Sequence, residues 1–376
     1  MVLLPENEVY FRRVILSHLR LHQFKNHENS SFDFCDKINS ISGPNGSGKT
    51  NILDAIYTLS NTKSYFNHID QQLIQFGKDE YSLKGMFRAN ESDSNLDFQV
   101  LLTLQNKKKS LKKNGKPYSR LLEHIGTIQT VFITPYDISL VFEGSEERRK
   151  FIDFTISQIN KNYLFALVEY RKYLDQRNAF LKNNFGRNID SLILESFDVK
   201  ISPIADEIHK ARKAFIDEFI PLFEENYKFI SESSEVPQID YLSPLNNKSM
   251  LSVLEENRTS DLLSQRTGLG IHKDDIEFLL NNQPLKKFGS QGQIKSFVIA
   301  LKIAQYQYFK QNSQQYPILL LDDIFEKIDS QRSQKLMERM CSTEFGQIFI
   351  SDTHSERIIE HFNPFDVAQK HFTLVK

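Results

Sequence analysis

The segment that most restricts the fold of this chain is a glycine-rich octapeptide, Gly43-Pro44-Asn45-Gly46-Ser47-Gly48-Lys49-Thr50. It matches a pattern in which two glycines bracket four residues and are followed by Lys and a hydroxyl residue. Residues 37–42 before it can form a short strand, and residues 51–59 after it carry apolar side chains at helical spacing. The sequence therefore predicts a strand, a glycine-rich loop and a helix in succession, which is the context that this pattern requires.

Such a loop is suited to bind a triphosphate together with Mg²⁺. Its consecutive backbone N–H groups and the positive end of the following helix would surround the phosphates. Lys49 would reach the outer phosphates, and Thr50 would hold the metal ion. The alternative is a glycine turn that precedes a helix by chance, and the completeness of the pattern favours the nucleotide site.

Composition places few further limits on the chain. Its 376 residues are 40% hydrophobic and 25% charged, which suits a globular protein with a large core or two domains. Because 47 basic residues nearly balance 48 acidic ones, any nucleic-acid surface must be local. Cys35 and Cys341 have no metal-ligand or redox spacing, and no signal peptide or run of about 18 apolar residues is visible. We expect a soluble intracellular protein.

The N-terminal third should contribute strands. Residues 13–21 and 31–34 look like two strands joined by a turn, and we expect them to enter the sheet that carries the phosphate loop. Alternating apolar residues at 98–104 precede a lysine-rich segment with the tight-turn pair Asn114-Gly115. We predict a hairpin whose tip is either simply solvated or grips the DNA backbone. Its six lysines are Lys107, Lys108, Lys109, Lys112, Lys113 and Lys116.

Helical periodicity dominates the region after Gly144. Apolar residues recur at steps of three and four over 156–174 and again over 197–215, which predicts an antiparallel pair of long helices. Pro203, with Ser202 before it as a cap, either starts a new helix or kinks a continuous one. We therefore expect residues 1–144 and 236–376 to form the two parts of one domain, with residues 145–235 as a helical insertion.

The last third returns to alternating strand and helix. Residues 318–321 and 347–350 are continuous apolar runs typical of central parallel strands, with a crossover helix at 330–340 between them. The first run ends in Asp322-Asp323. Asp322 would bind Mg²⁺ through water, and Asp323 would orient or deprotonate the attacking water. Adjacent acids at a strand end are weak evidence alone, but the phosphate loop favours this interpretation.

A second motif, Ser290-Gln291-Gly292-Gln293, opens an apolar helix. By itself it is a capped helix, with Ser290 as the N-cap. However, the order of phosphate loop, helical insertion, Ser-x-Gly-Gln and apolar-Asp-acid resembles the ABC-type ATPase heads of the SMC and Rad50 class. In that class the Ser-Gly signature of one subunit completes the ATP site of another. The resemblance implies that Ser290 meets the loop of a second copy.

Finer matches resemble the RecF family and run nearly from end to end of the chain. Each is a short segment, and their order and spacing together are specific. They are Leu21 to Asn26, Thr62 to Tyr65, Phe132 to Asp137, Glu147 to Asp153, and Gly270 to Asp275. The chain departs from the family pattern in three places, where Lys25 replaces Arg, Ile271 replaces Pro, and Asp323 stands where many ABC-type ATPases have Glu.

The resemblance implies an α/β fold: a P-loop ABC-type ATPase head of mixed sheets and flanking helices, with an inserted antiparallel helical arm. It also implies ATP and Mg²⁺, weak DNA-dependent ATP hydrolysis, and an ATP-driven homodimer that closes on duplex DNA at single-strand gaps or junctions. RecR with RecO, and indirectly RecA, would be its partners in DNA replication, recombinational repair and the response to DNA damage. The location would be the cytoplasm, at the nucleoid, with no membrane partner.

Several residues keep two interpretations. Arg148 and Arg149 either contact phosphate or are solvated charges at a helix start. His354 either touches the terminal phosphate or has a structural role, and Gln129 is a candidate for the glutamine that links the lobes in this class. Other functional classes are an SMC-like or Rad50-like structural ATPase, a transporter nucleotide-binding subunit and a small-molecule kinase. The short insertion without Cys-x-x-Cys disfavours the first, while membrane coupling or turnover by a monomer would identify the others.

Overall fold

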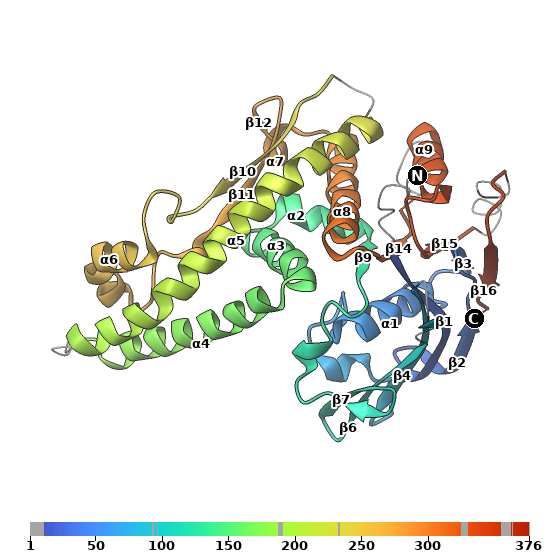
Figure 1. The fold of residues 1–376 in the computed structure, drawn as a ribbon, viewed down its shortest axis with the longest axis horizontal. Coiled ribbons are helices and arrows are strands. Elements are labelled where there is room, and N and C mark those ends of the chain that lie inside the picture. Colours follow the sequence, from blue (N-terminus) through green and yellow to red (C-terminus); the bar gives the residue numbers. More distant parts are fainter. Residues whose placement is uncertain are drawn as a thin grey trace, which may run out of the picture. The chain divides into compact units, whose positions relative to one another are not determined.

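The computed structural model describes residues 11–91, 94–95, 97–186, 191–231, 234–324, 330–354, 362 and 364–375. The chain forms two compact units, which are drawn in Figure 1. Unit 1 comprises residues 1–137 and 299–376, and unit 2 comprises residues 138–298. The three-part domain division at residues 144 and 235 stays a prediction.

The described residues of unit 1 form two sheets. Within the described residues, the parallel sheet has five strands in the order β16 (Gln369–Thr373), β3 (Ile38–Ser42), β15 (Ile348–Asp352), β14 (Ile318–Asp322) and β9 (Thr130–Ile133). Every residue of β3, β14 and β15 is buried, as central parallel strands require. Helix α9 (Ser330–Cys341) lies between β14 and β15 in sequence. The predicted assembly of this sheet from both ends of the chain is confirmed.

The larger sheet is mostly antiparallel. Among the described residues its main path is β13 (Gln315–Tyr316), β1 (Arg12–Phe24), β4 (Tyr81–Glu91), β6 (Phe98–Gln105), β7 (Lys108–Lys113) and β8 (Lys116–Pro117). Strand β2 (His27–Asp33) pairs with β1, and β5 (Ser94–Asn95) pairs with β4. Helix α1 (Lys49–Asn61) contacts strands of both sheets. Short 3₁₀ helices lie at Asp70–Leu73, Leu121–His124 and Pro135–Ile138.

The prediction that residues 13–21 and 31–34 join the sheet of the phosphate loop is wrong. They form β1 and β2 of the antiparallel sheet, whereas the loop follows β3 of the parallel sheet. The burial patterns give the reason, because β2 alternates between exposed and half-buried positions while β3 is buried throughout. A strand with one solvated face suits an antiparallel sheet, and a strand buried on both faces suits a parallel one.

The lysine-rich segment forms two tight turns where one was predicted. Asn106 and Lys107 join β6 to β7, and Asn114 and Gly115 join β7 to β8. All four residues have positive φ, between 48° and 76°, as a two-residue hairpin turn requires. Lys109 points inward, where its ammonium contacts Asp70 and donates to the carbonyl of Thr62. The lysines therefore do not form a single solvated tip.

Unit 2 is mainly helical. Its helices are α2 (Ser139–Phe142), α3 (Ser145–Ile159), α4 (Lys161–Asn183), α5 (Ser191–Ser231), α6 (Met250–Ser264) and α7 (Leu285–Phe288), with a 3₁₀ turn at Ile271–Lys273. A small sheet joins β10 (Pro237–Leu242), β11 (Asp275–Leu280) and β12 (Gln283–Pro284). The boundary between the units falls within α8 (Gln291–Ser313).

The predicted pair of long helices is present as α4 and α5 (Figure 1), with two corrections. The apolar run over 156–174 is broken at Asn160, which has an extended backbone and accepts a hydrogen bond from the N–H of Tyr163. Helix α5 is continuous and contains both Pro203 and Pro221. Ser202 is not a cap, since its hydroxyl donates to the carbonyl of Asp198 within the helix.

Among the described residues, no helix combines the length and apolar character needed to cross a membrane.

Candidate nucleotide-binding site

The glycine-rich loop connects β3 to α1, as predicted. Gly43 has φ 152° and Gly48 has φ 100°, a region that favours glycine. A Cβ on Gly48 would lie 2.6 Å from side-chain atoms of Asn26 and His27, and one on Gly43 would lie 2.6 Å from the carbonyl oxygen of Leu374. Glycine is therefore required at both positions by backbone conformation and by close neighbours.

Lys49 is buried at the first turn of α1, with 4% of its surface exposed. Its ammonium donates to the carbonyl oxygen of Gly43 at 2.7 Å and to that of Pro44 at 3.3 Å. Both hydrogen-bond partners are neutral carbonyls, and the carboxylate of Asp322 acts on the ammonium only through its charge. This arrangement leaves the charge of Lys49 for an anion bound in the loop.

Thr50 and Asp322 meet although 272 residues separate them in sequence. The hydroxyl of Thr50 donates to the Asp322 carboxylate at 2.8 and 3.1 Å, and the hydroxyl of Ser351 donates to it at 2.6 Å. Strands β3, β15 and β14 are parallel neighbours, so their carboxyl ends bring these side chains to one edge. Burial raises the pKa of Asp322, and the hydrogen bonds from Ser351 and Thr50 oppose the rise.

Asp323 follows at the same edge, and its backbone has φ 47°. Its N–H lies 3.3 Å from the carbonyl oxygen of Ser351 and 3.2 Å from the Ser351 hydroxyl. A left-handed conformation is uncommon for aspartate and recurs at functional sites. Ser351 therefore positions both adjacent acids, a role that sequence reasoning missed.

The turn between β1 and β2 packs against the loop from the other sheet of unit 1. The Asn26 amide donates to the carbonyl of Gly46 at 3.3 Å and accepts from Asn51 at 2.7 Å. His27 Nε2 donates to the carbonyl of Gly48 at 3.2 Å, which leaves Nδ1 to accept from Ser30. Burial lowers the pKa of His27, which favours this neutral form. Asn26 stood in a family-like segment, whereas nothing in the sequence singled out His27.

Lys25, which replaces the Arg of the family pattern, forms an ion pair at 2.7 Å with Asp54, a fully buried residue of α1. Asp54 also accepts hydrogen bonds from the hydroxyl of Ser64 and the N–H of Tyr65, both at 2.7 Å. Two of the family-like segments thus meet at one buried carboxylate. Their shared purpose here is to fix α1 against the turns around it.

The residues present fit a triphosphate with Mg²⁺. The hydroxyl of Ser47 is buried in the loop and has no hydrogen-bond partner among the described residues, so it can bond to a ligand in the loop. Thr50 and Asp322 supply the hydroxyl and carboxylate oxygens that Mg²⁺ prefers. A cluster of His, Cys or acidic side chains, as transition metals require, does not occur among the described residues.

The second motif lies in unit 2 at the start of α8. The hydroxyl of Ser290 accepts from the N–H of Gln293 at 3.2 Å, and the Gln293 side chain accepts from the N–H of Ser290 at 2.7 Å. This reciprocal pair is a capping box, so the predicted cap is confirmed. Ser290, Gln291 and Gly292 are exposed. Whether they contact a nucleotide stays a prediction.

The remaining candidates lie in different places. Arg148 forms a two-pronged ion pair with Asp275, at 2.8 and 3.1 Å, and Arg149 donates to the carbonyl of Asp274 at 2.6 Å, so neither is a freely solvated charge. Gln129 precedes β9 at the amino edge of the parallel sheet, opposite the loop. The side chain of His354 is 64% exposed at the carboxyl edge.

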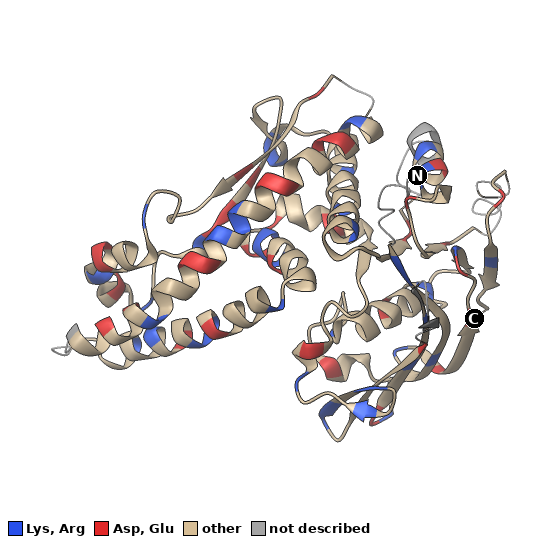
Figure 2. Ribbon diagram, viewed as in Figure 1, with Lys and Arg blue, Asp and Glu red and all other residues tan. Residues whose placement is uncertain are grey.

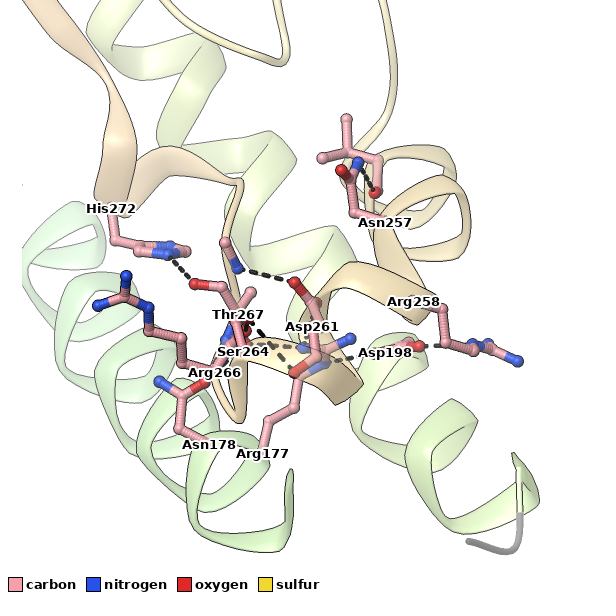
Figure 3. Close-up of polar contacts among 12 residues, drawn as sticks. Arg177, Asn178, Asp198, Asn257, Arg258, Asp261, Ser264, Arg266, Thr267 and His272 are labelled. Carbon is pink, nitrogen blue, oxygen red and sulfur yellow. Dashed lines mark hydrogen bonds and ion pairs between the residues drawn. The ribbon is translucent and has the colours of Figure 1, made fainter. Parts of the chain in front are cut away.

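A second polar cluster, which joins α4, α5 and α6 of unit 2, was not expected (Figure 3). Arg177 of α4 is fully buried and contacts Asp198 of α5 and Asp261 of α6, both at 2.7 Å. It also donates to the hydroxyl of Thr267 at 2.7 Å. Nearby, His272 Nε2 donates to the carbonyl of Thr267 at 3.1 Å, and Tyr170 donates to His272 Nδ1 at 2.8 Å. Arginine thus ties three helices together.

Comparison with known proteins identifies the class of proteins that shares this fold and this loop. Residues 15–372 match the family model described as the RecF/RecN/SMC N terminal domain. A Pyrococcus furiosus Smc head domain has TM-score 0.54 and 16% identity, over 93% of this chain and 92% of that one, and it supports the fold alone. The chain is therefore a member of the RecF/RecN/SMC class, and the predicted ATPase-head fold is confirmed.

Closer relatives define the family. A DNA replication and repair protein RecF from Flavobacterium johnsoniae is 44% identical over 91% of this chain and 95% of its own. One from Azobacteroides pseudotrichonymphae is 40% identical over 96% of this chain and 97% of its own. A solved structure of "the recombination mediator protein RecF-ATP in RecFOR pathway" has TM-score 0.85 and 27% identity over 96% of each chain. The chain belongs to the RecF family.

Proposed function

We propose that this protein is an ATP-switched clamp on DNA. ATP with Mg²⁺ would bind at Gly43 to Thr50, two copies would close on duplex DNA, and hydrolysis would reopen them. The observation that carries the proposal is the hydrogen bond from Thr50 to Asp322, since it joins the phosphate loop to the acidic strand end. Similarity to a solved structure described as RecF-ATP supports ATP as the nucleotide.

The roles of the loop residues follow from their positions. Lys49 would bind the outer phosphates, and Thr50 with Asp322 would hold Mg²⁺, which would supply charge neutralisation at the transferred phosphoryl group. Asp323, the second acid, would orient the attacking water. Its side chain is one methylene shorter than glutamate, which is consistent with slow hydrolysis and with binding as the switch.

The second half of each site would come from another copy of the chain. The exposed segment Ser290 to Gly292 is positioned by a capping box, so its hydroxyl and N–H groups have fixed directions. We infer that this segment of one copy contacts the nucleotide held by the loop of the other. Residues 145–235 would act as the inserted arm between the two parts of the head.

The cellular role is proposed from the family. Relatives are named DNA replication and repair proteins, and the related structure is described as part of the RecFOR pathway. We infer binding of duplex DNA at single-strand gaps or junctions, recruitment of RecR with RecO, and loading of RecA. ATP turnover would be weak and stimulated by DNA, in the cytoplasm at the nucleoid.

Self-association measured by light scattering tests the clamp. The protein should be monomeric without nucleotide and with ADP, and dimeric with ATP and Mg²⁺. A protein that stays monomeric with ATP would exclude the shared site.

Ser290→Arg tests the signature directly. It should preserve ATP binding to the monomer but prevent dimerisation and hydrolysis, because the bulky cation would occupy the closed interface. Ser260→Arg, on an exposed position of α6, is the matched control and should dimerise normally. Loss of ATP binding in Ser290→Arg would reject the assignment of Ser290 to the other copy's site.

A further inference from the structure

The antiparallel sheet of unit 1 has one packed face and one face toward solvent. Leu21, Leu83, Leu102 and Leu111 lie side by side on the packed face and are buried. Gly85 belongs to the same face, since a Cβ there would lie 3.1 Å from Leu59 of α1. The alternate residues of each strand, one position away, therefore point to the opposite, outer face.

A basic row crosses this outer face. The strand register places Arg20 of β1 opposite Lys84 of β4, Lys84 opposite Leu101 of β6, and Leu101 opposite Lys112 of β7. Arg20 and Lys112 are exposed, and Lys84 and Leu101 are half-buried. The row spans three strand spacings, or about 14 Å. The register, not the sequence order, brings these charges into line.

The charges in the row are uncompensated. Within the part of the chain that the structure describes, Arg20, Lys84 and Lys112 form no ion pair. Asp33, also on this face, is hydrogen-bonded to His18 at 2.7 Å. Like charges directly opposite on a sheet are destabilising, so Arg20 beside Lys84 costs stability unless an anion lies over them. This holds although the chain as a whole has a formal charge of −1.

The adjacent row is polar and contains no Asp, Glu, Lys or Arg. His22 faces Asn29 at 2.7 Å, and Thr103 faces Ser110 at 2.8 Å, with Ser82 between these two pairs. Hydroxyl and amide groups beside basic ones are the usual partners of phosphate and sugar oxygens. Figure 2 marks the basic residues of β7, where Lys112 lies. The lysine-rich segment is thus the end of a wider surface.

We propose that this outer face binds the backbone of duplex DNA, with Arg20, Lys84 and Lys112 each contacting a phosphate. The inference rests on the proposed DNA clamp and adds the location of the contact. Recognition is independent of base sequence, since the three basic side chains contact phosphates, which carry no sequence information directly.

The test is binding of a short duplex, measured by fluorescence anisotropy with ATP and Mg²⁺ between about 50 and 200 mM salt. In Arg20→Gln/Lys84→Gln/Lys112→Gln, the slope of log affinity against log salt should become shallower by about 2.7, since each phosphate contact contributes about 0.9. Two unrelated duplex sequences should lose affinity equally. ATP affinity and melting temperature should not fall, because the variant removes like-charge repulsion.

A variant with the same charge change is the control. Lys182→Gln/Lys200→Gln/Lys213→Gln, at exposed positions of α4 and α5, should retain the wild-type slope. The single substitution Lys84→Gln should make the slope of log affinity against log salt shallower by about 0.9. This single variant replaces the triple variant in the test if the triple variant folds poorly. If the wild-type protein does not bind duplex DNA, the proposed DNA clamp is wrong. If the wild type binds but the slope is unchanged in the sheet variant, or changes equally in the control, only the proposed location of the contact is wrong.

Discussion

Lys49 and Arg177 are both buried cations, but they are held by different partners. Lys49 contacts two neutral backbone carbonyls, whereas Arg177 contacts two carboxylates. A cation held by carbonyls keeps its net charge for an anionic ligand, while one held by carboxylates is neutralised where it lies. The partners of a buried charge, more than its burial, therefore separate a binding role from a structural one.

The largest effect should come from Arg177→Leu. Two buried carboxylates, Asp198 and Asp261, would lose their main partner, so the free energy of unfolding should fall by about 3–5 kcal/mol. Chemical denaturation measures this. The control Arg258→Ala removes a more exposed partner of Asp198 and should cost much less. Comparable losses in the two variants would show that Arg177 does not hold the helices together.

Lys49→Ala should lower ATP affinity while leaving folding stability almost unchanged, the reverse of Arg177→Leu. ATP affinity should fall about 100-fold, which corresponds to loss of one charged contact in a preorganised site. Its unfolding free energy should change little, since the partners left behind are carbonyls of a partly exposed loop. Titration with a fluorescent ATP analogue measures the affinity, with Lys200→Ala on α5 as the control. If Lys49→Ala binds ATP normally but unfolds easily, Lys49 has a structural role and not a binding one.

Acidification should weaken the cluster of unit 2 through His272. Burial lowers the pKa of His272 from 6.5 to about 4, so the unfolded chain takes up a proton before the folded one does. The stability is therefore fully present above pH 6.5 and is lost as the pH falls toward 4. Protonation of Nδ1 would also oppose the hydrogen bond from Tyr170.

The loss attributable to His272 at pH 5 should be about 2 kcal/mol. Denaturation of wild type and His272→Gln at pH 7 and 5 measures it, and the gap between them should narrow at the lower pH. Parallel losses in both proteins would exclude His272 as the titrating group.

The smallest effects should come from two hydroxyl groups, that of Ser47 in the phosphate loop and that of Thr267 in the cluster around Arg177. Ser47→Ala removes a hydroxyl that has no partner, so folding stability should hold while ATP affinity falls about tenfold or less. Thr267→Val removes a hydroxyl that bonds Arg177 and Asn178, so it should cost about 1–3 kcal/mol of stability. If the two variants are equally stable, the hydroxyl of Thr267 contributes no more to folding than that of Ser47, and the proposed difference between the phosphate loop and the Arg177 cluster is wrong.

The local parts of the site could be predicted from sequence. A few adjacent residues indicate each of these parts: the loop, the helix after it, the buried strands that end at Asp322 and Asp352, and the cap at Ser290. The partners were not predictable in the same way. No local signal indicated that Lys25 pairs with Asp54. Nor did one indicate that Lys109 turns inward to Asp70, since its hairpin tip was predicted to be solvated or to grip DNA.

The sequence by itself determined where phosphate can bind, because glycines with positive φ, a following helix and a buried strand are local requirements of backbone geometry. Only the tertiary structure decided that β1 and β3 lie in different sheets, that Asn26 and His27 close over Gly48, and that Arg20, Lys84 and Lys112 form one row. The physical reason is that periodicity fixes which face of a strand is buried but not its neighbour or register. Distant charges meet only once the strands have paired.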